Sequence, residues 1–208
     1  MFNGKFVWLK GAIKKWFLLF GYEIVKDNNG NHLKKIYSSK SAIQFMKENY
    51  NKKDLIVAEI GVWKGHTTEH IIKTLPIKRI YAIDSWAPWS SSEHNEEIIQ
   101  TAMKEAKKKL SKYGNKVIII KKYSKDAVKD IKEKLDFVYI DGDHDYEFVK
   151  EDIELYYKLL KKGGVLSGDD IENRRLSNGV FKALSEFSVK NKLDVKIEGN
   201  NWWLIKPD

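Results

Sequence analysis

The chain has 208 residues, of which 42% are hydrophobic and 32% are charged, and this is enough apolar material for one globular domain with a small appendage. The composition excludes a disordered tail and a fibrous repeat. The chain contains no cysteine, which excludes disulfides, thiolate zinc sites and cysteine nucleophiles. The net charge is +9, but only Arg79, Arg174 and Arg175 are arginines. Because bidentate recognition of phosphates and bases favours arginine, nucleic acid is an unlikely partner.

No segment predicts a membrane span or export. The longest uncharged apolar run, Trp16 to Tyr22, has seven residues, well below the roughly 18 that a transmembrane helix needs. Residues 1–20 lack the small-residue cleavage site of a secretory signal. We therefore expect a soluble, cytoplasmic protein.

The first fifty residues differ from the rest of the chain. Two predicted helices, about Lys5–Phe20 and Ser39–Asn49, flank a polar stretch that contains the turn cluster Asn28-Asn29-Gly30-Asn31. We interpret residues 1–50 as an N-terminal helical arm or cap and residues 51–208 as the main domain. The apolar residues of the first helix favour packing as a cap or against a second copy of the chain, and peripheral contact with an anionic membrane is the alternative.

From Asp54 onward, short β-branched runs alternate with stretches of helical period, which is typical of βαβ units around a parallel sheet. The two final runs are joined by Glu198-Gly199-Asn200-Asn201 and predict an antiparallel hairpin. The sequence thus predicts an α/β fold with a Rossmann-like, doubly wound sheet of seven mostly parallel strands. The predicted strands are Leu55–Ile60, Arg79–Ile83, Lys116–Ile120, Phe137–Ile140, Val165–Ser167, Asp194–Ile197 and Trp202–Ile205.

A glycine-containing turn follows the first predicted strand of this domain. The pattern is Glu-x-Gly-x-x-x-Gly-x-Thr, formed by Glu59, Gly61, Gly65 and Thr67. Glycines at a strand-to-helix turn let the backbone and the helix amides approach a ligand closely. Asp84 ends the second strand, where an acid can hold a ribose hydroxyl pair. These residues resemble the first two motifs of class I S-adenosylmethionine-dependent methyltransferases, which implies that they bind the adenosyl cofactor.

Two other interpretations of the same stretch are weaker. His66, Glu69 and His70 match the H-x-x-E-H pattern of zinc peptidases, but a solvated helix face explains the two histidines as well. A nicotinamide dehydrogenase is disfavoured because three residues, not one, separate Gly61 from Gly65.

Acidic residues follow two neighbouring strands. Asp141 and His144 come after the fourth strand, and Asp169 and Asp170 come after the fifth. Because the carboxyl ends of adjacent parallel strands share one edge of the sheet, these carboxylates are expected to crowd together there. A hard divalent ion such as Mg²⁺, bound by Asp141, Asp169 and Asp170, would relieve the crowding. The alternative is that these loop acids form turns and helix N-caps, with Asp143 or Asp145 capping one helix and Asp169 or Asp170 capping the next.

The stretch Tyr139 to Tyr146, the long helix after it and Gly168-Asp169-Asp170 are similar to the later motifs of metal-dependent sugar and macrolide O-methyltransferases. This resemblance spans roughly Asp54 to Asp208. It implies that Asp141 and the acidic pair bind Mg²⁺, that Asp141 also contacts the cofactor, and that His144 is the general base. Catechol-type relatives carry Lys at the position of His144 and Asp-Asn at the acidic pair, so a catechol is not the expected acceptor.

Further residues are placed near the site by the resemblance and by chain order. Ser124 follows the third strand, where this fold meets adenine, and it is also a potential N-cap for a helix over 125–134. Trp86 and Trp89 lie in the loop after Asp84, and they either stack on the ligand or pack in the core. Arg174 and Arg175 either bind an anionic acceptor or are solvated loop residues.

The function expected from the sequence is methyl transfer from S-adenosylmethionine to a hydroxyl of a sugar or another small-molecule or glycan acceptor, with Mg²⁺ lowering the pKa of that hydroxyl. The alternatives are a nucleic-acid or protein methyltransferase and a non-catalytic module that binds an adenosyl ligand. The strand-four exit Ile-Asp-Gly-Asp-His differs from the Asn/Asp-Pro-Pro-aromatic loop typical of base amino methylation.

Overall fold

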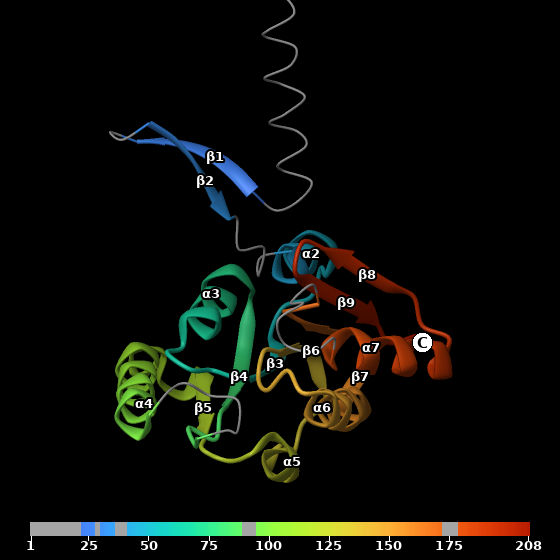
Figure 1. Ribbon diagram of the computed structural model, residues 1–208. Helices are drawn as coiled ribbons and strands as arrows, with labels where there is room; N and C mark the ends of the chain where they lie inside the picture. Colours follow the sequence, from blue (N-terminus) through green and yellow to red (C-terminus); the bar gives the residue numbers. More distant parts are fainter. Residues whose placement is uncertain (1–21, 28–29, 36–40, 89–94, 172–178) are drawn as a thin grey trace, which may run out of the picture.

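The computed structural model describes residues 22–27, 30–35, 41–88, 95–171 and 179–208 (Figure 1). The strands are β1 (Tyr22–Asp27), β2 (Gly30–Lys35), β3 (Leu55–Ile60), β4 (Ile77–Ile83), β5 (Val117–Ile120), β6 (Leu135–Ile140), β7 (Leu160–Gly168), β8 (Val195–Glu198) and β9 (Asn201–Ile205). The α-helices are α2 (Ser41–Asn49), α3 (His66–Thr74), α4 (Glu96–Leu110), α5 (Ser124–Ala127), α6 (Tyr146–Leu159) and α7 (Gly179–Asn191), and short 3-10 helices span Ser111–Lys116 and Val128–Asp130.

The centre of the fold is a seven-stranded sheet in the order β5-β4-β3-β6-β7-β9-β8. Strands β3 to β7 run parallel to one another, and β9 pairs antiparallel with both β7 and β8. The strand order reverses between β3 and β6, so the carboxyl ends of these two strands lie at the switch point where open α/β sheets bind their ligands. The structure confirms the predicted fold class.

The alternation of side chains along the strands divides the core into two layers. Ile56, Ala58 and Ile60 of β3 face one layer, which includes buried side chains of α5, α6 and α7. Leu55 and Val57 face the other layer, together with side chains of α2 and α3. Helix α4 adds a third cluster beside β4. Because β3 is buried on both faces, it is apolar along its whole length except at Glu59.

Most predicted elements of the main domain are confirmed within two residues at their ends. The exceptions are β7, which begins at Leu160 rather than Val165, and the helix predicted over 125–134. The latter prediction was wrong, because α5 ends at Ala127 and a 3-10 turn follows it. Its sequence offers few buried positions, Ala127 and Ile131, to support a longer amphipathic helix.

In the first fifty residues, the predicted second helix is confirmed as α2, whose Ala42, Ile43 and Met46 are buried against the sheet. The polar stretch before it contains two strands that the sequence analysis did not predict, β1 and β2, paired as a separate antiparallel sheet. The helix predicted over Lys5–Phe20 lies outside the described residues.

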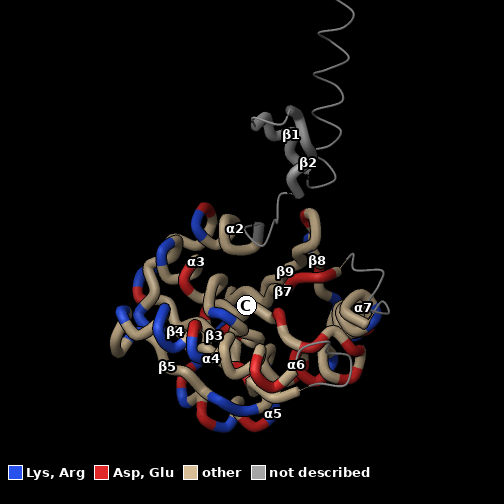
Figure 2. The backbone as a smooth tube through the Cα atoms, turned by 60° about the vertical axis from the view of Figure 1, so that its left-hand side comes forward, with Lys and Arg blue, Asp and Glu red and all other residues tan. Residues whose placement is uncertain are grey.

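None of the helices in the described ranges is long and apolar enough to cross a membrane. Figure 2 shows lysines interleaved with acidic residues along the outer helices. Ion pairs contribute to this pattern, for example between Lys64 and Glu105 and between Lys122 and Asp130. The positive net charge is thus partly compensated locally.

Candidate functional site

A cavity of about 690 Å³ opens at the carboxyl ends of β3, β4, β5 and β6. This volume is within the range of small-molecule and cofactor sites. Seven of the predicted site residues line it, namely Gly61, Thr67, Asp84, Trp86, Ser124, Asp141 and His144, whereas Glu59 and Gly65 are not among the lining residues. The structure therefore brings segments that are far apart in the sequence into one cavity.

Gly61 is the point where the β3 turn meets the end of β6. Its φ of 89° lies in the left-handed region, and a Cβ on this residue would lie 1.9 Å from the backbone oxygen of Asp141. No other residue fits both requirements. Gly65, with a φ of 71°, stands directly before α3 and lets the chain enter that helix.

Glu59 is completely buried at the end of β3. Burial raises the pKa of its carboxyl to about 8, and the neighbouring Thr68 lowers it in part. Neither carboxylate oxygen has a hydrogen-bond partner of good geometry among the described residues. A buried carboxyl left in this state is costly, so its retention beside the cavity suits a residue that binds a ligand donor.

Asp84 organises the wall of the cavity beside the glycine turn. Its two oxygens accept hydrogen bonds from the backbone amides of Trp63, over 2.8 Å, and Trp86, over 2.7 Å. Both tryptophans have left-handed φ angles, 49° and 42°, which is unusual for side chains of this size. Burial raises the pKa of Asp84, and the backbone hydrogen bonds act against that rise. Asp84 thus holds two strained residues in place at the cavity wall.

Ser124 lies at the opposite end of the cavity and is the first residue of α5, not its N-cap, which is Tyr123. Two residues of α6 hold Ser124. Tyr156 donates a hydrogen bond to its backbone oxygen over 2.9 Å, and Asp152 interacts with its hydroxyl. Asp152 is 3% exposed, and burial raises its pKa to about 7. Asp152 also lines the cavity, and the sequence analysis did not predict it. The sequence indicates only that Asp152 lies on the long helix, beside apolar residues that face the core.

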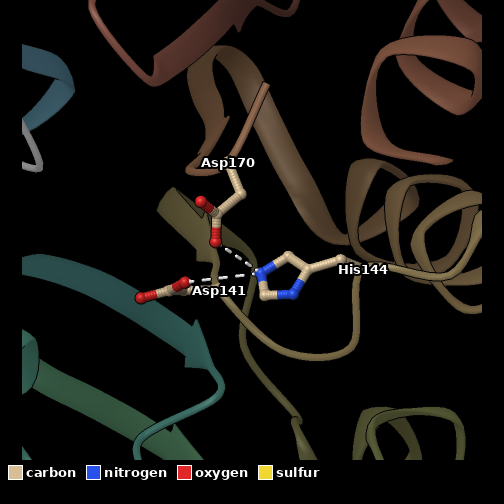
Figure 3. A group of neighbouring side chains, drawn as sticks. All are labelled: Asp141, His144 and Asp170. Carbon is tan, nitrogen blue, oxygen red and sulfur yellow. Dashed lines mark ion pairs between the residues drawn. The ribbon is translucent and has the colours of Figure 1, made fainter. Parts of the chain in front are cut away.

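The acidic cluster is assembled from the exits of β6 and β7 (Figure 3). The ligand atoms of Asp141, His144 and Asp170 all lie within 4.8 Å of one another. His144 Nε2 is 2.8 Å from Asp170 Oδ2 and 4.0 Å from Asp141 Oδ1. Asp169 is adjacent but outside this group, and its Oδ1 accepts a hydrogen bond from Asn201.

The charges of the cluster shift one another's protonation. Burial raises the pKa of Asp141 well above its usual range, and the charges of Asp169 and Asp170 raise it further. Burial alone would lower the pKa of His144, but its hydrogen bond to Asp170 and the neighbouring carboxylates outweigh this effect and raise it. The protonated form of His144 is therefore favoured by the neighbouring carboxylates.

The donor set fits a hard divalent cation. Two of the three grouped side chains, Asp141 and Asp170, offer carboxylate oxygens, which Mg²⁺ prefers, and Asp141 also lines the cavity. A cation here would replace the positive charge of His144. Asp145, at the N-cap of α6, makes no side-chain cap hydrogen bond, whereas Asp143 Oδ1 accepts a hydrogen bond from the amide of Asp145 and so stabilises the turn before α6.

The remaining predicted residues are placed differently. Trp86 lines the cavity but is only 3% exposed, and its Nε1 donates to the backbone oxygen of Trp63 over 3.0 Å, so it packs in the wall. Trp89, Arg174 and Arg175 lie outside the described residues. In the H-x-x-E-H stretch, Glu69 is paired with Lys112 and Lys73, which does not suit a zinc site.

The comparisons with known proteins agree with this geometry. A family described as "Methyltransferase domain" matches residues 58–171, more than half of the chain and all of the strands and turns that build the cavity's centre. The fold is that of class I S-adenosylmethionine-dependent methyltransferases. The chain belongs to this methyltransferase family.

One relative among curated proteins is uncharacterized protein R132 of Acanthamoeba polyphaga mimivirus, which is 31% identical over 149 residues. The alignment covers 69% of this chain and 64% of that protein, so the chain spans less than two thirds of the relative's length.

Several solved structures share the fold. The TDP-rhamnose 3′-O-methyltransferase CalS11 of calicheamicin biosynthesis aligns with a TM-score of 0.59 at 13% identity, covering 83% of this chain and 81% of that one. An O-methyltransferase from Bacillus cereus in complex with SAH aligns with a TM-score of 0.55 at 14% identity, and the alignment covers 79% of this chain and 78% of that one. An rRNA methylase from Streptococcus thermophilus aligns with a TM-score of 0.58 at 17% identity, and the alignment covers 80% of this chain and 95% of that one. At these identities the likeness shows the fold alone.

Proposed function

We propose that this protein transfers the methyl group of S-adenosylmethionine to a hydroxyl of a sugar or another small-molecule or glycan acceptor, assisted by Mg²⁺. The observation that carries the proposal is the position of His144. Its imidazole lines the cavity and turns its Nε2 toward two carboxylates, where a base for a hydroxyl proton is needed. The same fold serves a TDP-rhamnose O-methyltransferase, which supports a sugar acceptor.

The cofactor would occupy the cavity from the glycine turn to Ser124. Asp84 would receive the ribose hydroxyls, and Ser124 would lie at the adenine. Glu59 and Asp141 would face the methionine end beside Gly61, whose lack of a side chain lets the backbone approach closely. This arrangement directs the methyl group toward His144, so that the acceptor oxygen can be held in line for displacement.

Asp141, Asp169 and Asp170 would hold Mg²⁺, which would supply Lewis-acid chemistry by lowering the pKa of a bound hydroxyl. His144 would accept the proton of that hydroxyl, and the carboxylates of Asp170 and Asp141, whose oxygens lie 2.8 Å and 4.0 Å from its Nε2, would stabilise the resulting imidazolium. The buried Trp86 would add an apolar surface to the cavity wall. The residues thus position the acceptor, take its proton and keep the reacting groups in a site of low dielectric.

The proposal is tested by calorimetric titration with S-adenosylhomocysteine, followed by transfer of radiolabelled methyl groups to a panel of nucleotide sugars, free sugars and oligosaccharides. Each acceptor is assayed with Mg²⁺ and with EDTA, and structured RNA is included as a competing acceptor. We expect micromolar binding of S-adenosylhomocysteine, and Mg²⁺-dependent transfer to a hydroxylated small molecule that is lost in His144→Ala. Transfer to RNA alone, or unchanged transfer by His144→Ala, would contradict the proposal.

A further inference from the structure

The acidic pair after β7, Asp169 and Asp170, accepts hydrogen bonds from the hairpin formed by β8 and β9. Asn201 Nδ2 donates a hydrogen bond to Asp169 Oδ1 over 3.0 Å, and Asn200 Nδ2 donates to Asp170 Oδ1 over 2.7 Å. Neither asparagine lines the cavity. The two amides therefore contact the acids on the side that faces the hairpin.

The sheet register explains this pairing. β7 and β9 are antiparallel, and the last pair of their ladder is Gly168 with Trp202. Continuing the same register by one and two residues places Asp169 opposite Asn201 and Asp170 opposite Asn200. A backbone hydrogen bond of 3.2 Å from Ile171 N to Asn200 O keeps the chains together beyond the ladder. The hairpin that closes the sheet thus reaches into the acidic cluster.

The two hydrogen bonds fix one oxygen of each acid. In Asp170 the bonded atom is Oδ1, and the other oxygen, Oδ2, is the atom that lies 2.8 Å from His144. In Asp169 the Oδ1 atom accepts from Asn201 and also from the backbone amide of Asp170, over 2.9 Å. An amide donor orients a carboxylate without neutralising it, whereas a lysine at either position would compete with a cation for the same charge.

We propose that Asn200 and Asn201 are positioning residues that orient the acidic pair for a divalent cation. The inference rests on the proposed function of the site. Outer partners that hydrogen-bond to metal-binding carboxylates typically change metal affinity by roughly 10- to 100-fold when they are removed. Asn201 is completely buried at the start of β9 and orients Asp169. Asn200 lies in the turn between β8 and β9 and orients Asp170.

The test measures Mn²⁺ affinity by electron paramagnetic resonance, with and without saturating S-adenosylhomocysteine, whose own affinity is measured by calorimetry. The variants are Asn200→Ala and Asn201→Ala. Asn191→Ala is the matched control, because it also removes an asparagine side-chain donor, but one that bonds to the backbone oxygen of Phe187 within α7 and not to a carboxylate. Asn201 is completely buried, so Asn201→Ala could fail to fold, and Asn200→Ala tests the inference at a less buried position. Thermal unfolding is measured for each variant to show that it is folded.

We expect each hairpin variant to bind Mn²⁺ about 10-fold more weakly or worse. S-adenosylhomocysteine affinity should stay within about twofold of the wild-type value, because Asp84 and Ser124 are untouched, and Asn191→Ala should change neither affinity. Wild-type Mn²⁺ affinity in both folded hairpin variants would overturn the inference and leave the proposed function standing. A wild-type protein that binds S-adenosylhomocysteine but no Mn²⁺ would overturn both the inference and the metal requirement. Failure to bind S-adenosylhomocysteine would overturn the proposed function. In that case the Mn²⁺ titration carried out without S-adenosylhomocysteine would still decide the inference.

Discussion

Tyr156 on α6 donates a hydrogen bond to the backbone oxygen of Ser124, 32 positions earlier in the chain, over 2.9 Å. Asp152, one turn before Tyr156, interacts with the hydroxyl of the same serine. The loop that carries His144 leads into the N-terminus of this helix. One rigid element therefore fixes both the far end of the cavity and the start of the acidic cluster.

Tyr156→Phe should weaken cofactor binding without changing the packed ring. Losing one buried hydrogen bond should lower the free energy of unfolding by about 1–2 kcal/mol, measured by urea denaturation. Because Ser124 is then held less firmly, the dissociation constant of S-adenosylhomocysteine should rise several-fold in calorimetry. Tyr81→Phe is the control, since it removes a hydroxyl that bonds to Glu133 and does not line the cavity. Equal loss of affinity in both variants would mean that the effect is general destabilisation.

Gly179→Ala should impair methyl transfer more than it impairs cofactor binding. A Cβ on this first residue of α7 would lie 2.3 Å from the backbone oxygen of His144 and 2.7 Å from the amide of Tyr146. Both of these atoms belong to the backbone and cannot move out of the way as a side chain can, so the loop that carries His144 must shift. We expect at least a 10-fold loss of turnover, because catalysis is sensitive to displacements of about 1 Å.

The affinity of Gly179→Ala for S-adenosylhomocysteine should stay close to that of the wild type, since Gly61 and Asp84 are not displaced. Steady-state kinetics and calorimetry on the same preparation separate the two effects. Wild-type turnover in this variant would show that the position of the His144 loop does not limit the reaction.

Glu59 should make the cofactor-free protein less stable as the pH rises. In the unfolded chain this carboxyl loses its proton near its usual pKa of 4.5, whereas in the folded protein burial raises the pKa to about 8. Between these values the unfolded state binds fewer protons, so the free energy of unfolding falls with increasing pH, in total by on the order of 5 kcal/mol. Below pH 4.5 the contribution of Glu59 is constant.

The measurement is urea denaturation between pH 5 and 8 for the wild type and Glu59→Gln. The glutamine does not titrate, so the difference between the two curves isolates Glu59 from Asp152, which shifts in the same direction. We expect the curves to converge or cross as the pH rises. Parallel curves over this range would show that the Glu59 carboxyl ionises at its usual pKa in the folded protein.

The sheet was predictable because its strands are buried on both faces. Runs such as Leu55–Ile60 are apolar and β-branched, and they end at residues, like Gly61, that break the strand for a geometric reason. The acids after β6 and β7 could be placed at one edge from the parallel topology alone. The strands β1 and β2 were missed because the turn cluster between them and the polar sequence of β2 indicate a loop, although β1 carries the strand-favouring Tyr22, Ile24 and Val25.

Contacts within the site were less accessible to sequence analysis. The hydrogen bonds of Asn200 and Asn201 depend on the register of an antiparallel pair, which a shift of one residue would change completely. The role of Trp86 depends on a left-handed backbone at a residue type that rarely adopts it. Asp152 looks like one more charged residue of an amphipathic helix, and only packing against Ser124 shows that it faces the cavity.

Lys192→Gly should stabilise the protein without touching the site. Lys192 directly follows α7, is exposed and has a left-handed φ of 53°, and its amide donates to the backbone oxygen of Val189. Glycine adopts this conformation without strain and is the preferred residue after a helix, so we expect a gain of about 0.5–1 kcal/mol in the free energy of unfolding. Lys190→Gly, inside the last turn of the same helix, should instead cost about 1 kcal/mol. Thermal and urea unfolding measure both changes, and a loss of stability in Lys192→Gly would show that α7 does not end in the left-handed conformation.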